Sequence, residues 1–163
     1  MVVRIKSPER DYKHQLNVKL VLHAQSSTNK QSIVRLEVTD PDPEQLFLYT
    51  LDCAESDFHI FKVEQHFHSS FQEFPKFIIA NLQTCQSTTQ LELSNFDQVS
   101  NGHHVPAKLL YCTLEVGVSD EGVLRFEEKT PYNMLQHASL KLKKANNVTL
   151  LNHLALKLKE SLT

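Results

Sequence analysis

Histidine and cysteine are the residues in this sequence with the widest scope for chemistry. There are nine histidines, and the close pairs are His66-Phe67-His68 and His103-His104. In an extended segment, His66 and His68 would lie on one face of a strand, where both could bind the same metal ion. Neither pair has an acidic or cysteine residue at the spacing of a known metal site. The pattern therefore favours solvated histidines over a metal centre, and we expect no bound cofactor.

The three cysteines, Cys53, Cys85 and Cys112, are odd in number, widely spaced and surrounded by apolar residues. This distribution is typical of reduced, buried thiols in the cytosol rather than of a disulfide framework. Spacing does not exclude a cysteine nucleophile, because a histidine partner needs only to meet it in space. We favour inert thiols, since Cys112 lies in the middle of an expected strand and Cys85 on an apolar helical stripe.

Motifs that bind or transfer phosphate are absent from the sequence. It contains no P-loop, GxGxxG or GxSxG pattern, and it has three glycines, Gly102, Gly117 and Gly122. A loop that cradles phosphate needs more glycine than this. With no metal site or activated nucleophile in view, the sequence predicts a protein that is not an enzyme.

Tyr132 is the remaining candidate for a functional residue. It lies in "EEKTPYNMLQHASLKLK", residues 127–143, whose second half alternates like a buried strand, while Pro131-Tyr132-Asn133 forms the preceding turn. A large aromatic side chain in such a turn either packs back on its own sheet or is presented to another molecule. The residues alone leave both alternatives open, because tyrosine is often half buried with a solvated hydroxyl.

The composition is that of one soluble globular domain. The chain has 163 residues, of which 40% are hydrophobic and 22% charged, and it can bury a core without disulfides or metals. Its 17 basic and 19 acidic residues give a net charge of -2, so there is no electrostatic case for nucleic acid or an anionic membrane as partner. We expect a soluble intracellular protein, because no signal peptide or membrane-spanning stretch is visible.

Period-two alternation predicts about seven strands, antiparallel in character, with a pair of helices inserted. The clearest are 14–24, with Leu16, Val18, Leu20 and Leu22 on one face, and 33–40, which should pair as a hairpin and end at Asp40-Pro41-Asp42-Pro43. The others are expected at 45–52, 89–94, 108–118, 123–128 and 138–143.

Helical spacing appears in three places. Residues 55–65 predict a short helix with Ser56 as a possible cap, followed by a brief extended piece at 66–71. A second helix should begin near Pro75 and bury Phe74, Ile78, Leu82 and Cys85.

The third helix covers residues 147–163, with Leu151, Leu154, Ala155, Leu158 and Leu162 on one face. This stripe either packs on the core or begins a coiled coil. We expect a head domain at 1–146 and the start of a stalk helix at 147–163.

Two segments of the chain resemble the centriolar cartwheel protein family, spindle assembly abnormal protein six. The first is "DPDPEQLFLYTLDCAESDFHIFKVEQHFHSSFQEFPKFIIANLQTC", with its FLY-x-L run and its FP-x-F-I-x-x-L-x-x-C helix, and the second is "TPYNMLQHASLKLKKANNV". The resemblance covers residues 34–97 and 123–160. It implies a head domain of the kind shared with X-ray-repair scaffold proteins, a seven-stranded antiparallel barrel or sandwich that carries a helix-turn-helix and a stalk helix.

The resemblance also implies roles for particular residues. In the family an aromatic at the loop position of Tyr132 inserts into a neighbouring head. Pro131 and Asn133 would hold this side chain in a rigid turn. Leu151, Leu154 and Leu158 would form the seam of a stalk dimer. This sequence has tyrosine where phenylalanine is usual, and a buried hydroxyl without a partner would cost about 1–3 kcal/mol.

The function implied by the resemblance is non-enzymatic. Self-association of the heads, alternating with stalk dimers, would build the cartwheel ring of centrioles or basal bodies. The protein would then be located in the cytoskeleton. Its partners would be other copies of itself and other centriolar proteins. The alternative is a monomeric head that recruits a different cytoskeletal or scaffold protein, as a coil-less relative at the flagellum base would.

Overall fold

The computed structural model describes residues 1–24, 32–42, 47–94, 109–117 and 119–162, and the following account refers to these residues. They form one sheet of eight strands, three α-helices and one short 3-10 helix. The strands are β1 (Val2–Lys6), β2 (Asp11–Gln15), β3 (Asn17–Ala24), β4 (Ser32–Thr39), β5 (Leu48–Ala54), β6 (Leu109–Val116), β7 (Glu121–Lys129) and β8 (Met134–Lys144). The helices are η1 (Glu55–Asp57), α1 (Phe58–Glu64), α2 (Glu73–Ser94) and α3 (Asn147–Ser161).

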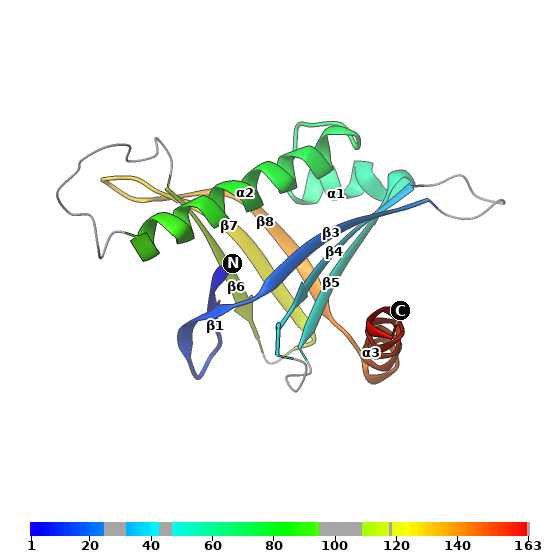
Figure 1. Ribbon diagram of the computed structural model, residues 1–163. Coiled ribbons are helices and arrows are strands. Elements are labelled where there is room, and N and C mark those ends of the chain that lie inside the picture. The colour runs from blue at the N-terminus through cyan, green and yellow to red at the C-terminus, as the bar shows by residue number, and fades with distance from the viewer. Residues whose placement is uncertain (25–31, 43–46, 95–108, 118, 163) are drawn as a thin grey trace.

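The sheet is curled into a half-barrel with the strand order β2-β1-β6-β7-β8-β5-β4-β3 (Figure 1). Neighbouring strands are antiparallel except β1 and β6, which run parallel. The two ends of the sheet approach each other where the Leu16 amide donates to the Met1 carbonyl at 2.9 Å. Helix α2 crosses one side of the half-barrel and contacts both β6 and β3.

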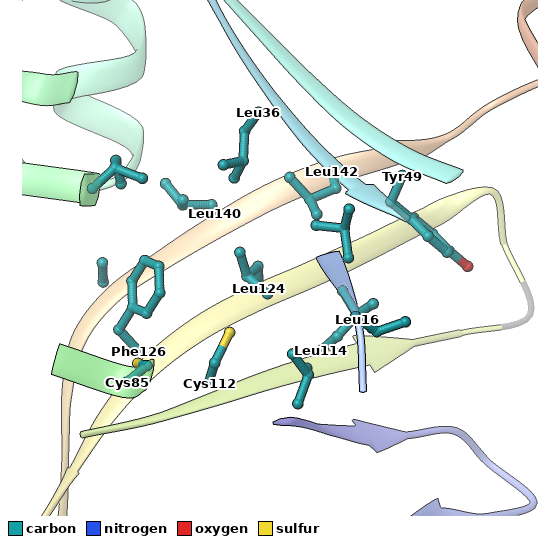
Figure 2. Close-up of a cluster of buried hydrophobic side chains, with 14 of the residues drawn as sticks. Leu16, Leu36, Tyr49, Cys85, Cys112, Leu114, Leu124, Phe126, Leu140 and Leu142 are labelled. Atoms are coloured by element: carbon teal, nitrogen blue, oxygen red, sulfur yellow. The ribbon is translucent and has the colours of Figure 1, made fainter. Parts of the chain in front are cut away.

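The core lies inside the curl of the sheet, on the faces that the alternation predicted. Leu36, Leu124, Leu140 and Leu142 are among the side chains that meet there (Figure 2). Fully burying one such side chain stabilises the fold by about 1.5–3 kcal/mol. The predicted hairpin of 14–24 with 33–40 is confirmed by the β3–β4 register, although Leu22 is exposed and the first strand is divided at Leu16 into β2 and β3.

The inner stripe predicted for α2 is confirmed. Phe74, Ile78 and Cys85 are buried, Leu82 is partly buried against the core, and Pro75 lies in the first turn. The capping prediction for Ser56 is wrong: Ser56 lies within η1, and Asp57 precedes α1 without a side-chain capping hydrogen bond.

The extended piece predicted at 66–71 is also wrong, because this segment is an irregular turn between α1 and α2. The Phe67 amide donates to the Lys62 carbonyl at 3.0 Å, and His66 has a positive φ of 57°. The apparent alternation arises because Phe67 and Phe71 both join the aromatic cluster of the two helices, where Phe67 contacts Phe61 and Phe71 contacts Phe58.

The strand predicted at 89–94 is wrong because α2 continues through Ser94. Threonine and alternating leucine favour strands by propensity. Here the hydroxyls of Thr84, Thr88 and Thr89 donate to the carbonyls one helical turn earlier. Thr88 also accepts a hydrogen bond from the Leu110 amide at 3.1 Å, which joins the helix to β6. Tertiary contact therefore overrides local propensity.

Strand β1 and the first three residues of β2 were not predicted. Val3 and Ile5 are buried while Arg4 is exposed, which is the pattern of a half-buried strand, but β1 is short. Its parallel partner β6 is distant in the chain, with Arg4 opposite Thr113. The sheet therefore has eight strands and one parallel pair, not about seven antiparallel strands.

Candidate functional site

The connection between β7 and β8 is a four-residue loop organised around the hydroxyl of Thr130. Lys129 pairs with Met134 at the end of the hairpin, and the Thr130 amide donates to the Asn133 carbonyl at 2.9 Å. The Thr130 hydroxyl lies 2.8 Å from both oxygens of Asn133, the carbonyl and Oδ1, and can donate to either. It accepts from the amides of Tyr132, at 3.3 Å, and Asn133, at 2.9 Å.

This loop presents Tyr132 to solvent. Its side chain is 95% exposed, so in this structure the ring does not pack back on its own sheet. Pro131 restricts the backbone immediately before Tyr132, and Asn133 closes the turn through its bonds to Thr130. The structure thus brings the three residues predicted for the loop together with Thr130, which sequence reasoning missed.

Two further apolar side chains follow Tyr132 and were also missed. Met134 is 47% exposed and Leu135 is 46% exposed. A register shift between Phe126 and Glu127 leaves His137 as an extra residue in β8, with its Nε2 atom 3.2 Å from Oε2 of Glu128. Such a bulge bends a hairpin, and the tip beyond it extends past the end of α2 (Figure 1). The consecutive apolar pair Met134-Leu135, which interrupts the alternation, was the signal in the sequence.

A cavity of about 390 Å³ lies beside the tip of this hairpin, where Lys129 and Met134 belong to its lining. Its apolar lining includes Val2, Leu110 and Met134, and Cys85 of α2 also contributes. The charged lining is mainly cationic: Arg4, Lys6, Lys13 and Lys129, with Glu127. Arg4 is paired with Asp11 through two hydrogen bonds of 2.8 and 2.5 Å, and this ion pair lowers the pKa of the Asp11 carboxyl.

The cavity is close to the exposed tip because Met134 belongs to both. Thr89 and Thr113 also line the cavity, and the Thr89 hydroxyl donates to the Cys85 carbonyl at 3.0 Å, so polar residues as well as apolar ones surround the cavity. A cavity of this size with a few polar groups is able to accept one aromatic side chain and to pair a hydroxyl on it.

Helix α3 carries the leucines predicted for the stalk seam. It begins after Asn146, whose side chain accepts a hydrogen bond from the Thr149 amide at 2.8 Å. Leu151 is 65% exposed and Leu158 is 63% exposed, whereas Leu154 is partly buried. The helix stands beside the half-barrel rather than over the core (Figure 1), so the head leaves two of the three seam residues uncovered.

The thiols are buried, as predicted. Desolvation raises the pKa of Cys53 to about 11 and that of Cys85 to about 12, and it raises the pKa of Cys112 as well. The thiolate form needed for nucleophilic attack is therefore suppressed at neutral pH.

The histidines offer no assembled centre in the part of the chain that the structure describes. There, no group of three or more histidine, cysteine or acidic side chains could hold a metal ion. The predicted pair His103-His104 lies outside the described residues. Within the same residues, no helix combines the length and the apolar composition needed to cross a membrane.

Comparison with known proteins relates this chain to centriolar proteins. The family model described as "Centriolar protein SAS N-terminal domain" matches residues 1–142. The chain is 30% identical to the spindle assembly abnormal protein 6 homolog of Xenopus laevis over 145 residues, which are 85% of this chain and 20% of that protein. It is 31% identical to the homolog of Gallus gallus over 153 residues, 93% of this chain and 22% of that protein. The chain thus spans about a fifth of the length of these relatives.

Solved structures show a similar fold. An N-terminal fragment of Leishmania SAS-6 that contains part of its coiled coil aligns with a TM-score of 0.73 and 23% identity, covering 98% of this chain and 78% of the fragment. The N-terminal coiled-coil dimer of C. elegans SAS-6 aligns with a TM-score of 0.67 and 16% identity, covering 99% of this chain and 85% of that one.

Proposed function

The chain belongs to the family of the centriolar SAS N-terminal domain, and from this premise we propose that it is a non-enzymatic structural protein that self-associates to build the cartwheel ring of centrioles or basal bodies. The observation that carries the proposal is the 95% exposure of Tyr132 at the tip of a hydrogen-bonded loop, beside the exposed Met134 and Leu135. Exposed apolar side chains gathered in one place are typical of interaction surfaces.

In the proposed contact, Tyr132 of one head enters the cavity beside the hairpin tip of a second head. Met134 lies in both the tip and the cavity, so a two-fold axis near it would place each tip on the other cavity at once. Thr89, Thr113 and Glu127 supply hydrogen-bond partners for the tyrosine hydroxyl. Tyrosine can then replace the usual phenylalanine without leaving a buried hydroxyl unpaired.

A second contact would run along α3. Leu151 and Leu158 are exposed, and together with Leu154 they follow the spacing of a coiled-coil seam. Residues 1–146 would then be the head and 147–163 the beginning of the stalk. Two different two-fold contacts that alternate around an assembly generate a closed ring when the angle between their axes allows closure.

The head contact should be weak by itself. An interface centred on one loop buries less than about 1,200 Å², and a single aromatic side chain supplies most of its energy. Weak contacts are sufficient in a ring, because each head is held by neighbours on both sides and the effective local concentration is high.

Sedimentation velocity over a concentration series tests the proposal with Tyr132→Asp and Tyr132→Phe. The aspartate variant should fold but lose head pairing, because a charge would have to enter the cavity, whereas phenylalanine should still pair. Val63→Asp is a matched control, because Val63 is 76% exposed on α1, outside both the tip and the cavity lining.

Two results would contradict this proposal. If the wild-type protein stays monomeric at high concentration, the head does not self-associate and the alternative, a head that recruits a different protein, becomes the better explanation. If Tyr132→Asp and wild type associate equally, a different surface makes the contact.

A further inference from the structure

The conformation of the hairpin tip depends on one hydroxyl group. Thr130 Oγ1 contacts four polar atoms of the loop: it donates to one oxygen of Asn133 and accepts from the amides of Tyr132 and Asn133. A hydroxyl can do this because it has one proton to donate and two lone pairs that accept. A chemical change at this oxygen would alter each of these contacts.

Thr130 is also placed where an enzyme can reach it. Thr130 itself is half-buried, but the contacts of its hydroxyl lie at the surface. It is followed by Pro131, and residues 131–136 are all exposed at the far end of the hairpin (Figure 1). A threonine followed by proline in an exposed loop is the local sequence that proline-directed protein kinases recognise. These kinases accept serine as well as threonine before the proline, and the chain has two dipeptides of this kind, Ser7-Pro8 and Thr130-Pro131.

We infer that Thr130 is a phosphorylation site for a proline-directed serine/threonine kinase, and that its phosphorylation releases the loop and weakens head pairing. The weakening of pairing rests on the proposed function, whereas the modification and the release of the loop do not. The γ-phosphoryl group of MgATP is transferred to Thr130 Oγ1. A bond forms between this oxygen and phosphorus, the bond from phosphorus to the β,γ-bridging oxygen breaks, ADP leaves, and the hydroxyl proton passes to the kinase base.

The phosphorylated oxygen can no longer hold the loop. It has no proton to donate to Asn133, and as an ester oxygen it is a poor acceptor for the amides of Tyr132 and Asn133. The phosphate adds a charge of about -1.5 to -2 at neutral pH, close in the chain to Glu127 and Glu128. Both effects disfavour the turn that presents Tyr132.

Ser7 serves as an internal control for phosphorylation at Thr130. Its hydroxyl accepts from the Arg10 amide at 3.0 Å and donates to the Arg10 carbonyl at 3.1 Å, so it holds the β1–β2 turn in a similar way. It lies at the opposite end of β6, because Lys6 is opposite Glu115 whereas Lys129 is opposite Leu109. Phosphate at Ser7 should therefore leave Tyr132 in place.

The experiment treats the full chain with a purified cyclin-dependent kinase and MgATP, using the wild type, Ser7→Ala, Thr130→Val and Pro131→Ala. Tandem mass spectrometry should locate one phosphoryl group on Thr130 in Ser7→Ala, and much less in Pro131→Ala. Hydrogen exchange, measured at a concentration where the protein is monomeric, should be faster at the Tyr132 and Asn133 amides after phosphorylation of Thr130. Phosphorylation of Ser7 in Thr130→Val should not change exchange at these amides further.

Sedimentation velocity completes the test. Phosphorylated Ser7→Ala should pair about tenfold more weakly than the untreated variant, which corresponds to the loss of one or two hydrogen bonds. Absence of phosphate from Thr130 in the folded protein, or unchanged exchange after its incorporation, would overturn the inference. Tighter pairing would do so too, since it would mean that the cavity lysines attract the phosphate. If the untreated protein does not pair at all, the proposed function fails, and mass spectrometry with hydrogen exchange still decides the modification.

Discussion

Replacing Thr88 with valine should destabilise the head by about 1–3 kcal/mol, because it leaves a buried backbone amide without a hydrogen-bond partner. Thr88 and Leu110 are both buried, and the Thr88 hydroxyl accepts from the Leu110 amide at 3.1 Å. The register of β1 with β6 begins at Arg4 opposite Thr113, so β1 does not pair with Leu110. Thr88 therefore completes the hydrogen bonding of β6 where its neighbouring strand is missing.

Valine retains the branched shape of threonine, so the effect should come mainly from the lost hydroxyl. The Thr88 hydroxyl also donates to the Thr84 carbonyl at 2.9 Å, but this carbonyl lies within α2 and keeps its helical partner. The unpaired Leu110 amide then dominates, and a loss of about 2 kcal/mol lowers the melting temperature by about 4–8 °C for a chain of this size.

Thr84→Val is the matched control. Thr84 is half-buried on the same helix, and its hydroxyl donates to the Ala80 carbonyl at 2.9 Å in a hydrogen bond that lies at the surface. Removing this exposed hydroxyl should change stability by about 0.5 kcal/mol or less. Urea unfolding followed by far-ultraviolet circular dichroism measures both variants, since the chain has no tryptophan to serve as a fluorescent probe. Equal stability of the two variants would refute the role assigned to the Thr88–Leu110 bond.

Two further predictions concern the core. Gly122→Val should destabilise the fold by about 1–3 kcal/mol in urea unfolding. The reason is that a Cβ atom at Gly122 would lie 3.0 Å from Cε1 of Tyr49 and 3.4 Å from Cδ1 of Leu114. Unchanged stability would show that the Tyr49 ring moves aside freely. The raised pKa values of Cys53, about 11, and Cys85, about 12, keep these thiols protonated in the fold, so their contribution to stability should be constant below about pH 9 and fall as the pH rises from there towards these values. Cys53→Ala and Cys85→Ala should each reduce this loss of stability at high pH. A thiol reagent should label the native protein near pH 8 far more slowly than the protein in urea. Equal labelling rates would contradict the burial of these thiols.

The proposed interaction surface was only partly visible in the sequence. Tyr132, Pro131 and Asn133 were selected because an aromatic in a turn is unusual, and the structure places them together at an exposed tip. Thr130 escaped notice because a threonine before a proline has many structural roles, and its four contacts exist only after the turn closes. The cavity could not be anticipated at all, because Val2, Cys85 and Lys129 come from segments that meet only in the folded sheet.

Local periodicity was reliable where one face of an element is buried by the elements next to it. The alternation of β4, β6, β7 and β8 and the inner stripe of α2 were visible because each residue's environment repeats with the period of its own backbone. The same method failed at residues 89–94, where threonine and leucine favoured a strand and a contact to β6 extended the helix instead.

The sequence by itself therefore determined most strands of the core, the three helical segments and the turn that carries Tyr132, because these depend on residue type and spacing over a few neighbours. Only the tertiary structure decided that β1 lies parallel to β6, that α2 runs on to Ser94, and that a cavity opens beside the hairpin tip. These features depend on contacts between segments far apart in the chain, and the free energy of such contacts is not contained in any local pattern.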